Sequence, residues 1–172
     1  MQALATISAA EPKSRRWTRD EYYKMGDEGL FRDQRVQLIE GEIVVMSPQK
    51  VSHYAAIDKC RQLLEKLLGD DFWIRTQGPL TLNPNSEPEP DVSVVTGTRD
   101  DYQDHPKTAL LIVEVSQTAL GFDRNEKASL YAKAGIADYW IVNLIDRQLE
   151  VFRNPNPDEN HPYGFGYSEK KF

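Results

Sequence analysis

The chain has 172 residues, 40% of them hydrophobic and 28% charged, which is the size and composition of one soluble globular domain. A formal net charge of −6 argues against a protein that coats nucleic acid by bulk electrostatics, although it leaves room for a local basic groove. A single cysteine and three histidines exclude an internal disulfide and a zinc cluster of the usual spacings.

The sequence carries no sign of membrane insertion or export. Its longest apolar run, residues 109–113, is far shorter than the ~20 residues that a membrane helix needs. Residues 1–11 have neither the basic start nor the apolar segment of a signal peptide. We therefore expect a mobile leader over residues 1–16, one domain over residues 17–172, no membrane contact and a cytoplasmic location.

The first third of the chain predicts a helix, a hairpin and a second helix. Thr18 and Glu21 have the spacing of a capping box, in which two side chains cap the start of a helix. Glu40 and Gly41 separate two short strand-like segments and form the tight turn of a hairpin. Gly69 ends a segment whose apolar residues recur at helical spacing. We expect a helix from residue 18 to residue 26 or 29, strands at 36–39 and 42–46, and a helix from about 52 to 68.

Prolines and a covered strand organise the middle of the chain. Residues 87–90 alternate Glu and Pro, which favours an extended approach to the strand that begins at Asp91. Residues 110–115 are apolar on both faces except at Glu114, a pattern typical of a central strand with both faces covered. We expect strands at 72–76, 80–82, 91–95 and 110–115, and a polar loop at 96–107.

The last third predicts a helix followed by strands. Asp123 and Glu126 have the spacing of a second capping box, and Gly135 ends the helix that follows. We expect this helix at 123–134, a hairpin of strands at 139–142 and 149–152, and a weak strand at 165–167. The strand–helix–strand unit over residues 110–142 predicts an α/β fold, with a mixed β-sheet flanked by helices and preceded by an N-terminal helix and β-hairpin.

Three charged residues depart from the patterns around them. Glu114 lies inside an apolar strand, where an unpaired carboxylate is costly and therefore needs a cation, a lysine or a shifted pKa. Asp91 stands at the start of a strand, and strand ends in α/β sheets are where ligands usually bind. Lys127 falls on the apolar stripe of its helix, so it belongs to the face that packs on the sheet.

Two carboxylates and one ammonium group in one region suit the hydrolysis of phosphodiesters. Carboxylate oxygens are the ligands that Mg²⁺ prefers, and the ion keeps several waters free. Such a metal lowers the pKa of an attacking water and offsets charge that grows on a phosphate. A nearby lysine orients the water or stabilises the reacting phosphorus. The sequence therefore predicts a metal-dependent nuclease site built from Asp91, Glu114 and Lys127.

Each of these residues also has a purely structural explanation. Glu114 could pair with Lys127 or an arginine in a structural ion pair, which accounts for the charges equally well. Lys127 could lay its stem over apolar surface, and Asp91 could be a turn residue. The hypothesis of a site depends on the three occurring together. His53, at a helix start, and Gln77, before a Gly-Pro turn, are auxiliary candidates.

Short motifs follow one another along the chain from about Trp17 to Arg153. They are residues 38–42, 47–48 with His53, 77–80, 87–91, 112–116, 123–124 with Lys127, 130–136, 138–142 and 149–152. Each motif alone is weak, but their order and spacing are specific. Together they resemble the Uma-type restriction endonucleases, a group of the PD-(D/E)XK nuclease superfamily.

This resemblance implies a restriction-endonuclease-like core that hydrolyses DNA with Mg²⁺ or Mn²⁺. Asp91 would be the Asp of the PD motif and Glu114 the second carboxylate, with the Val115 carbonyl as a further metal ligand. The usual lysine, two residues after the second carboxylate, is absent, because Ser116 occupies that place. The resemblance assigns the lysine role to Lys127 on the following helix. A homodimer would suit the cleavage of two strands.

Two departures from the family pattern support a rival hypothesis or qualify the fold. Gln37 stands where relatives often carry a glutamate, and the chain ends at Phe172 where relatives usually continue through a further strand. The rival is a restriction-endonuclease-like module without catalysis, which binds nucleic acid or a protein partner. Gln37 and the acidic net charge favour it, whereas the intact Asp91, Glu114 and Lys127 favour the nuclease. A two-carboxylate glycosidase is a weaker alternative because it gives Lys127 no role.

Overall fold

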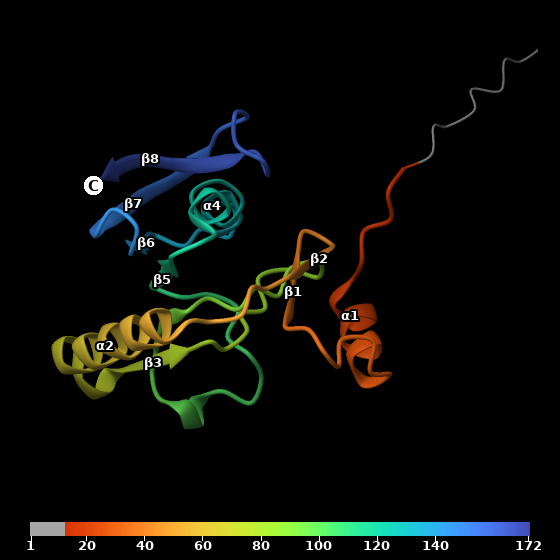
Figure 1. The fold of residues 1–172 in the computed structure, drawn as a ribbon, viewed down its shortest axis with the longest axis horizontal. Coiled ribbons are helices and arrows are strands. Elements are labelled where there is room, and N and C mark those ends of the chain that lie inside the picture. The colour runs from red at the N-terminus through yellow and green to blue at the C-terminus, as the bar shows by residue number, and fades with distance from the viewer. Residues whose placement is uncertain (1–12) are drawn as a thin grey trace, which may run out of the picture.

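The computed structural model describes residues 13–172, which form a six-stranded β-sheet, a separate β-hairpin and the helices around them (Figure 1). The sheet has the order β3-β4-β5-β6-β7-β8, and β1 pairs with β2 in the hairpin. In chain order the elements are α1 (Arg19–Asp27), β1 (Val36–Ile39), β2 (Glu42–Val45), α2 (Val51–Leu68), η1 (Gly69–Asp71), β3 (Phe72–Thr76), β4 (Val92–Thr96), η2 (Arg99–Asp101), β5 (Leu111–Ser116), α3 (Leu120–Phe122), η3 (Asp123–Lys127), α4 (Ala128–Lys133), β6 (Asp138–Asn143), β7 (Gln148–Pro157) and β8 (Phe165–Lys171).

The two central strands, β5 and β6, run parallel, and the other neighbouring pairs of this sheet are antiparallel. Parallel neighbours need a long crossover between them, and here the crossover is the helical stretch α3-η3-α4. This arrangement confirms the predicted mixed sheet flanked by helices, with an N-terminal helix and β-hairpin ahead of it.

Strand β5 lies between two layers of the core and is buried along its whole length. Val113 and Val115 belong to the cluster that packs under α2, whereas Ile112 belongs to the cluster around α4 (Figure 1). Because successive side chains of a strand point to opposite faces, Glu114 shares the face of Ile112. The strand therefore presents Glu114 toward α4 and Val115 toward α2.

Most of the predicted elements lie where the sequence places them. The capping box of α1 is present, since Thr18 Oγ1 accepts from the Glu21 N–H (3.3 Å) and the Glu21 carboxylate accepts from the Thr18 N–H (3.0 Å). The β1–β2 hairpin turns at Glu40 and Gly41, and α2 ends at Gly69. The predicted β6–β7 hairpin is present, and β8 extends well beyond the weak strand expected there.

The predicted strand at residues 80–82 is wrong. The Leu80 N–H donates to the Pro88 carbonyl (3.0 Å), and the Thr81 N–H donates to the Pro106 carbonyl (2.9 Å). Both partners are prolines, which have no N–H to donate in return and cannot continue a strand ladder. The apolar residues of this segment are therefore held by loops instead of by the sheet.

The predicted helix start at Asp123 is also wrong, because the helical stretch begins earlier, at Leu120. The Asp123 N–H donates to the Ala119 carbonyl (3.0 Å), as an interior helical residue does. Because it lies inside the helical stretch, Asp123 is not the residue at the N-cap, which is Ala119. The segment Asp123–Lys127 is a π-helix, a turn wider than the α-helical turn, and we call it the π turn.

The expected leader over residues 1–16 falls largely outside the described residues, since the description begins at residue 13. In the described part, Arg16 forms an ion pair with Glu42, and the Trp17 N–H donates to the Gly41 carbonyl (2.9 Å). Across residues 13–172, no helix combines the length and apolarity required to cross a bilayer.

A buried carboxylate ties the β6–β7 hairpin to the π turn. Glu150 of β7 is fully buried and accepts two hydrogen bonds from Arg124 (2.8 and 2.6 Å) and one from Asn143 (2.7 Å). Burial alone would raise the pKa of Glu150, but the hydrogen bonds from Arg124, Asn143 and Gln148 outweigh it and hold the pKa below the ordinary value of 4.5.

We expect Glu150→Gln to lower the free energy of unfolding at neutral pH by about 1–3 kcal/mol. The two carboxylate oxygens each accept a hydrogen bond from Arg124, whereas the amide of the variant has one oxygen and no charge. A depressed folded pKa stabilises the protein above the unfolded pKa, and this contribution is lost as pH falls through the folded pKa. The stability of the variant should therefore fall less steeply below about pH 4.5 than that of the wild type. Urea unfolding between neutral and acid pH measures both effects, and parallel pH profiles would contradict this assignment.

Candidate active site

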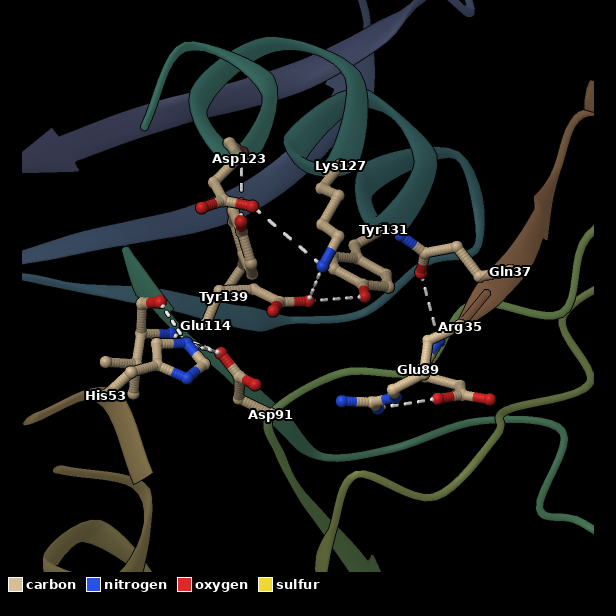
Figure 2. A network of polar contacts seen from close by, with 11 residues as sticks. Arg35, Gln37, His53, Glu89, Asp91, Glu114, Asp123, Lys127, Tyr131 and Tyr139 are labelled. Atoms are coloured by element: carbon tan, nitrogen blue, oxygen red, sulfur yellow. Dashed lines mark hydrogen bonds and ion pairs between the residues drawn. The ribbon is translucent and has the colours of Figure 1, made fainter. Parts of the chain in front are cut away.

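A cleft of about 280 Å³ opens where the hairpin, the start of α2, β5 and the π turn meet. One wall comes from residues 44–50, which join β2 to α2, and the other from residues 117–119 after β5. The charged and titratable residues that line it are Lys50, His53, Asp91, Glu114, Asp123 and Lys127. The three residues that the sequence singled out, Asp91, Glu114 and Lys127, thus line one cleft (Figure 2).

Asp91 stands immediately before β4 and is held from two sides. Its Oδ2 atom accepts a hydrogen bond from the Val115 N–H (2.8 Å) and lies 3.1 Å from His53 Nε2. The same His53 nitrogen lies 2.7 Å from the Val115 carbonyl oxygen. A carbonyl can only accept, so His53 Nε2 carries a proton. The hydrogen bond to Asp91 raises the pKa of His53, and the Val115 carbonyl adds to the effect.

Glu114 and Lys127 form a buried ion pair at the centre of the site. Lys127 Nζ lies 2.9 Å from Glu114 Oε1, and the Tyr131 hydroxyl donates to the same oxygen (2.8 Å). Burial raises the pKa of Glu114 to about 8, with Lys127 opposing the rise. Burial alone would lower the pKa of Lys127, but Glu114, Asp123 and Asp91 outweigh it and raise that pKa. The lysine therefore stays charged at neutral pH.

Asp123, which the sequence predicts as a helix cap and which lies in one of the family motifs, is a third carboxylate of the cleft. Its side chain is buried, and Oδ1 lies 3.9 Å from Lys127 Nζ. Burial raises the pKa of Asp123, and the lysine opposes the rise. The spacing of four residues between Asp123 and Lys127 was the available signal, because residues four apart share a helix face. That signal was missed because the same aspartate fits a capping box.

The carboxylates of the cleft retain free oxygens. The hydrogen bonds and ion pairs described for Asp91 and Glu114 all reach one oxygen of each, Oδ2 and Oε1. Within residues 13–172, no hydrogen bond reaches Asp91 Oδ1 or Glu114 Oε2. Asp91, Glu114 and Asp123 thus bring three carboxyl groups to one cleft. This donor set fits a hard divalent cation, which takes oxygen ligands.

Among the described residues, no three Asp, Glu, His or Cys side chains gather closely enough to ligate one ion by themselves. A cation held by Asp91 and Glu114 would therefore need a main-chain oxygen or water as well, as Mg²⁺ sites commonly do. The Val115 carbonyl lies near Asp91, since both contact His53 Nε2. A carbonyl oxygen has two lone pairs, so it can accept from His53 and still offer one to a cation.

The two remaining residues of interest lie differently. Gln77 does not line the cleft; its backbone N–H donates to the Asp91 carbonyl (3.1 Å), so it contacts the site through the main chain. Its side-chain nitrogen is buried and has no hydrogen-bond partner among the described residues. Gln37 does line the cleft, is buried, and accepts from the Glu89 N–H through Oε1 (3.2 Å).

Comparison with known proteins agrees with this geometry. The family model described as "Uma2: Putative restriction endonuclease" matches residues 19–165, which is most of the chain. The chain belongs to the Uma2 family. No protein in a search of the curated proteins matches it. A solved structure, titled as a putative nuclease belonging to DUF820 from Anabaena variabilis, has a TM-score of 0.62 at 16% identity and covers 79% of each chain.

Membership of the Uma2 family confirms the resemblance drawn from the motifs, and the structural neighbour confirms the fold. The position two residues after Glu114, where the superfamily usually has lysine, is Ser116 on the buried end of β5. In this Uma2 protein an ammonium group reaches Glu114 from the following helix instead, through Lys127. The chain is thus a restriction-endonuclease-like protein whose family description points to nucleic acid as the substrate.

Proposed function

We propose that this protein is a metal-dependent endonuclease that hydrolyses phosphodiester bonds in DNA. One observation carries the proposal: two carboxylates, each with one oxygen engaged and one free, share a cleft with a buried lysine. A structural ion pair of Glu114 and Lys127 would account for only part of this arrangement. It leaves unexplained why Asp91 and Asp123, two further buried carboxylates, line the same cleft.

Asp91, Glu114 and the Val115 carbonyl are the residues that would hold Mg²⁺ or Mn²⁺. When bound, such an ion lowers the pKa of a water and offsets the negative charge that develops on the phosphate. The protein keeps these oxygens in place through the side chains around them. The Val115 N–H and His53 fix Asp91, while Lys127 and Tyr131 fix Glu114.

Lys127 is the residue that would position the attacking water. Its side chain is buried, and its ammonium is held beside Glu114 at the wall of the cleft. In the reaction the water oxygen bonds to phosphorus and gives up a proton to solvent, one P–O ester bond breaks, and the leaving oxygen takes up a proton. A fixed positive charge at the cleft stabilises the phosphate as it gains negative charge.

The start of α2 is a second feature of the cleft that favours the binding of a phosphate. Lys50 and His53 of this helix start line the cleft, and the first turn of α2 contains no acidic residue. Lys50 makes no side-chain hydrogen bond to the first backbone N–H groups, so these groups are not satisfied by a capping side chain. Free N–H groups and the helix dipole favour an anion at this end.

Incubation of the purified protein with supercoiled plasmid and with single-stranded DNA, in Mg²⁺, in Mn²⁺ or in EDTA, tests the proposal. We expect nicking of plasmid with either metal and none in EDTA, because the carboxylates alone cannot offset the charge of the phosphate. Restoring metal to the EDTA sample should restore cleavage. Cleavage that continues in EDTA would contradict a metal site, and no cleavage by the folded protein under any condition would contradict the nuclease.

A non-catalytic binding module remains the second candidate because of Gln37, a neutral side chain buried in the wall of the cleft. If the module is correct, Mn²⁺ should produce no heat at millimolar concentration in a calorimetric titration. The nuclease predicts a binding isotherm. The titration separates the two candidates without depending on the choice of nucleic acid.

A further inference from the structure

The π turn brings three side chains on one face of a helix closer into line. Asp123, Lys127 and Tyr131 are spaced four residues apart, and all three face the Glu114 side of the helix (Figure 2). In an uninterrupted α-helix, residues eight apart are offset by about 80° around the axis. The wider π turn removes part of this offset between Asp123 and Lys127. The lysine ammonium therefore lies between two carboxylates.

One hydroxyl group contacts the main chain of the π turn directly. The carbonyl of Asp123 accepts from the Ala128 N–H five residues later, the bond that defines a π turn, and it also accepts from the Tyr139 hydroxyl (2.9 Å). Tyr139 lies in β6, is fully buried, and packs against the ring of Tyr131 with centroids 5.1 Å apart. Its ring is fixed by the core, so its hydroxyl presents a donor at one defined place.

We propose that Tyr139 is a positioning residue of the site: its hydroxyl holds the π turn and thereby holds Lys127 between Glu114 and Asp123. Among the described residues, Tyr139 makes no hydrogen bond to the proposed metal ligands, and it does not line the cleft. It acts through the main chain of Asp123. This inference rests on the proposed function only where it concerns cleavage, since the placement of Lys127 is a property of the protein alone.

The chain offers a matched control for Tyr139→Phe. Tyr167 of β8 belongs to the same aromatic cluster, is also buried, and donates its hydroxyl to a backbone carbonyl, that of Ile136, at the same distance of 2.9 Å. Tyr167→Phe removes a hydrogen bond of the same kind from the same core, but beyond the far end of α4. The two variants should therefore lose similar stability, and only the first should disturb the site.

The experiment measures Lys127 directly and then cleavage. In protein labelled with ¹³C at the lysine ε-carbon, the Lys127 signal is assigned by its loss in Lys127→Met. We expect Tyr139→Phe to shift this signal and to lower kcat on plasmid DNA by about tenfold to a hundredfold with KM unchanged, because a misplaced group loses catalysis before binding. Tyr167→Phe should leave both the signal and kcat as in the wild type.

A Lys127 signal that stays in place in Tyr139→Phe, or that moves equally in Tyr167→Phe, would overturn the inference. If the wild type cleaves no DNA, the proposed function fails, and the Lys127 signal still decides the role of Tyr139. If Tyr139→Phe does not fold, a measurement on the wild-type protein tests the inference instead. Its Tyr139 hydroxyl proton should exchange slowly and show a nuclear Overhauser contact to the Ala128 amide, and the absence of both would overturn the inference.

Discussion

Replacing Lys127 by Met is expected to lower kcat for plasmid nicking by about 100-fold to 1000-fold, the usual cost of removing one fixed group that stabilises developing charge. Met fills a similar volume, so the change removes the ammonium and not the packing. At about pH 9, where Glu114 of the wild type is ionised, we also expect a loss of about 3–5 kcal/mol in the free energy of unfolding, since the carboxylate would be buried without its partner. Plasmid nicking and urea unfolding measure the two effects.

The pH dependence of this loss has a defined sign. Lys127 opposes the rise in the pKa of Glu114, so its removal should raise that pKa further above 8. When the pKa of a carboxyl is higher in the folded protein than in the unfolded chain, ionisation of that carboxyl favours unfolding. The free energy of unfolding therefore falls as pH rises from the unfolded pKa to the folded pKa. The loss should therefore be larger at about pH 9 than at about pH 6.

A double variant tests the structural role of Lys127 separately. Lys127→Met with Glu114→Gln removes both charges of the pair, so most of the lost stability should return. The catalytic role is decided by the single variant, in which Glu114 is kept. Nicking by Lys127→Met within about threefold of the wild type, a factor below the usual cost of losing such a group, would rule out the catalytic role.

Replacing Asp91 by Asn should abolish Mn²⁺ binding and plasmid nicking with little loss of stability. The amide oxygen can still accept from the Val115 N–H and from His53, the two contacts that Asp91 makes through Oδ2. The negative charge is lost, and with it the affinity for a hard cation. Calorimetric titration with Mn²⁺ and thermal unfolding measure the two effects independently of any nuclease assay.

Asp91→Ala is the matched comparison for this prediction. It should also abolish metal binding, but it leaves the buried Val115 N–H and the His53 proton without an acceptor on that side. We expect it to cost about 1–3 kcal/mol more than Asp91→Asn and still to fold. A Mn²⁺ isotherm in either variant equal to that of the wild type would remove Asp91 from the metal site.

The strand that carries the site could be predicted because its pattern is extreme. Residues 110–115 are apolar on both faces except at Glu114, and β5 is indeed a buried central strand with that single carboxylate facing α4. The position of Lys127 followed from helical periodicity, and the lysine does lie on the buried face of its helix. These patterns are local, so one sequence is enough to find them.

The missing parts depend on contacts between distant segments. The sequence does not tell that Asp123 lies in a π turn, because such a turn is a single widened turn within a helical stretch. Nor does it tell that the Tyr139 hydroxyl reaches the Asp123 carbonyl, which requires β6 to lie beside β5. The strand predicted at residues 80–82 failed for a related reason, since its apolar pattern is local and its loop partners are not.

The order of the strands has a consequence for how the protein folds. Asp91, Glu114 and Lys127 all precede β6 in the chain, yet α4, which continues the helical stretch of the lysine, packs against β7 and β8. A parallel pair closes a long loop before its contacts form, which makes such pairing slow. We therefore expect the charged groups to stay hydrated through most of folding. Their dehydration, which costs free energy, then takes place in the last steps. Defects at this cluster should consequently speed unfolding while leaving the rate of folding almost unchanged.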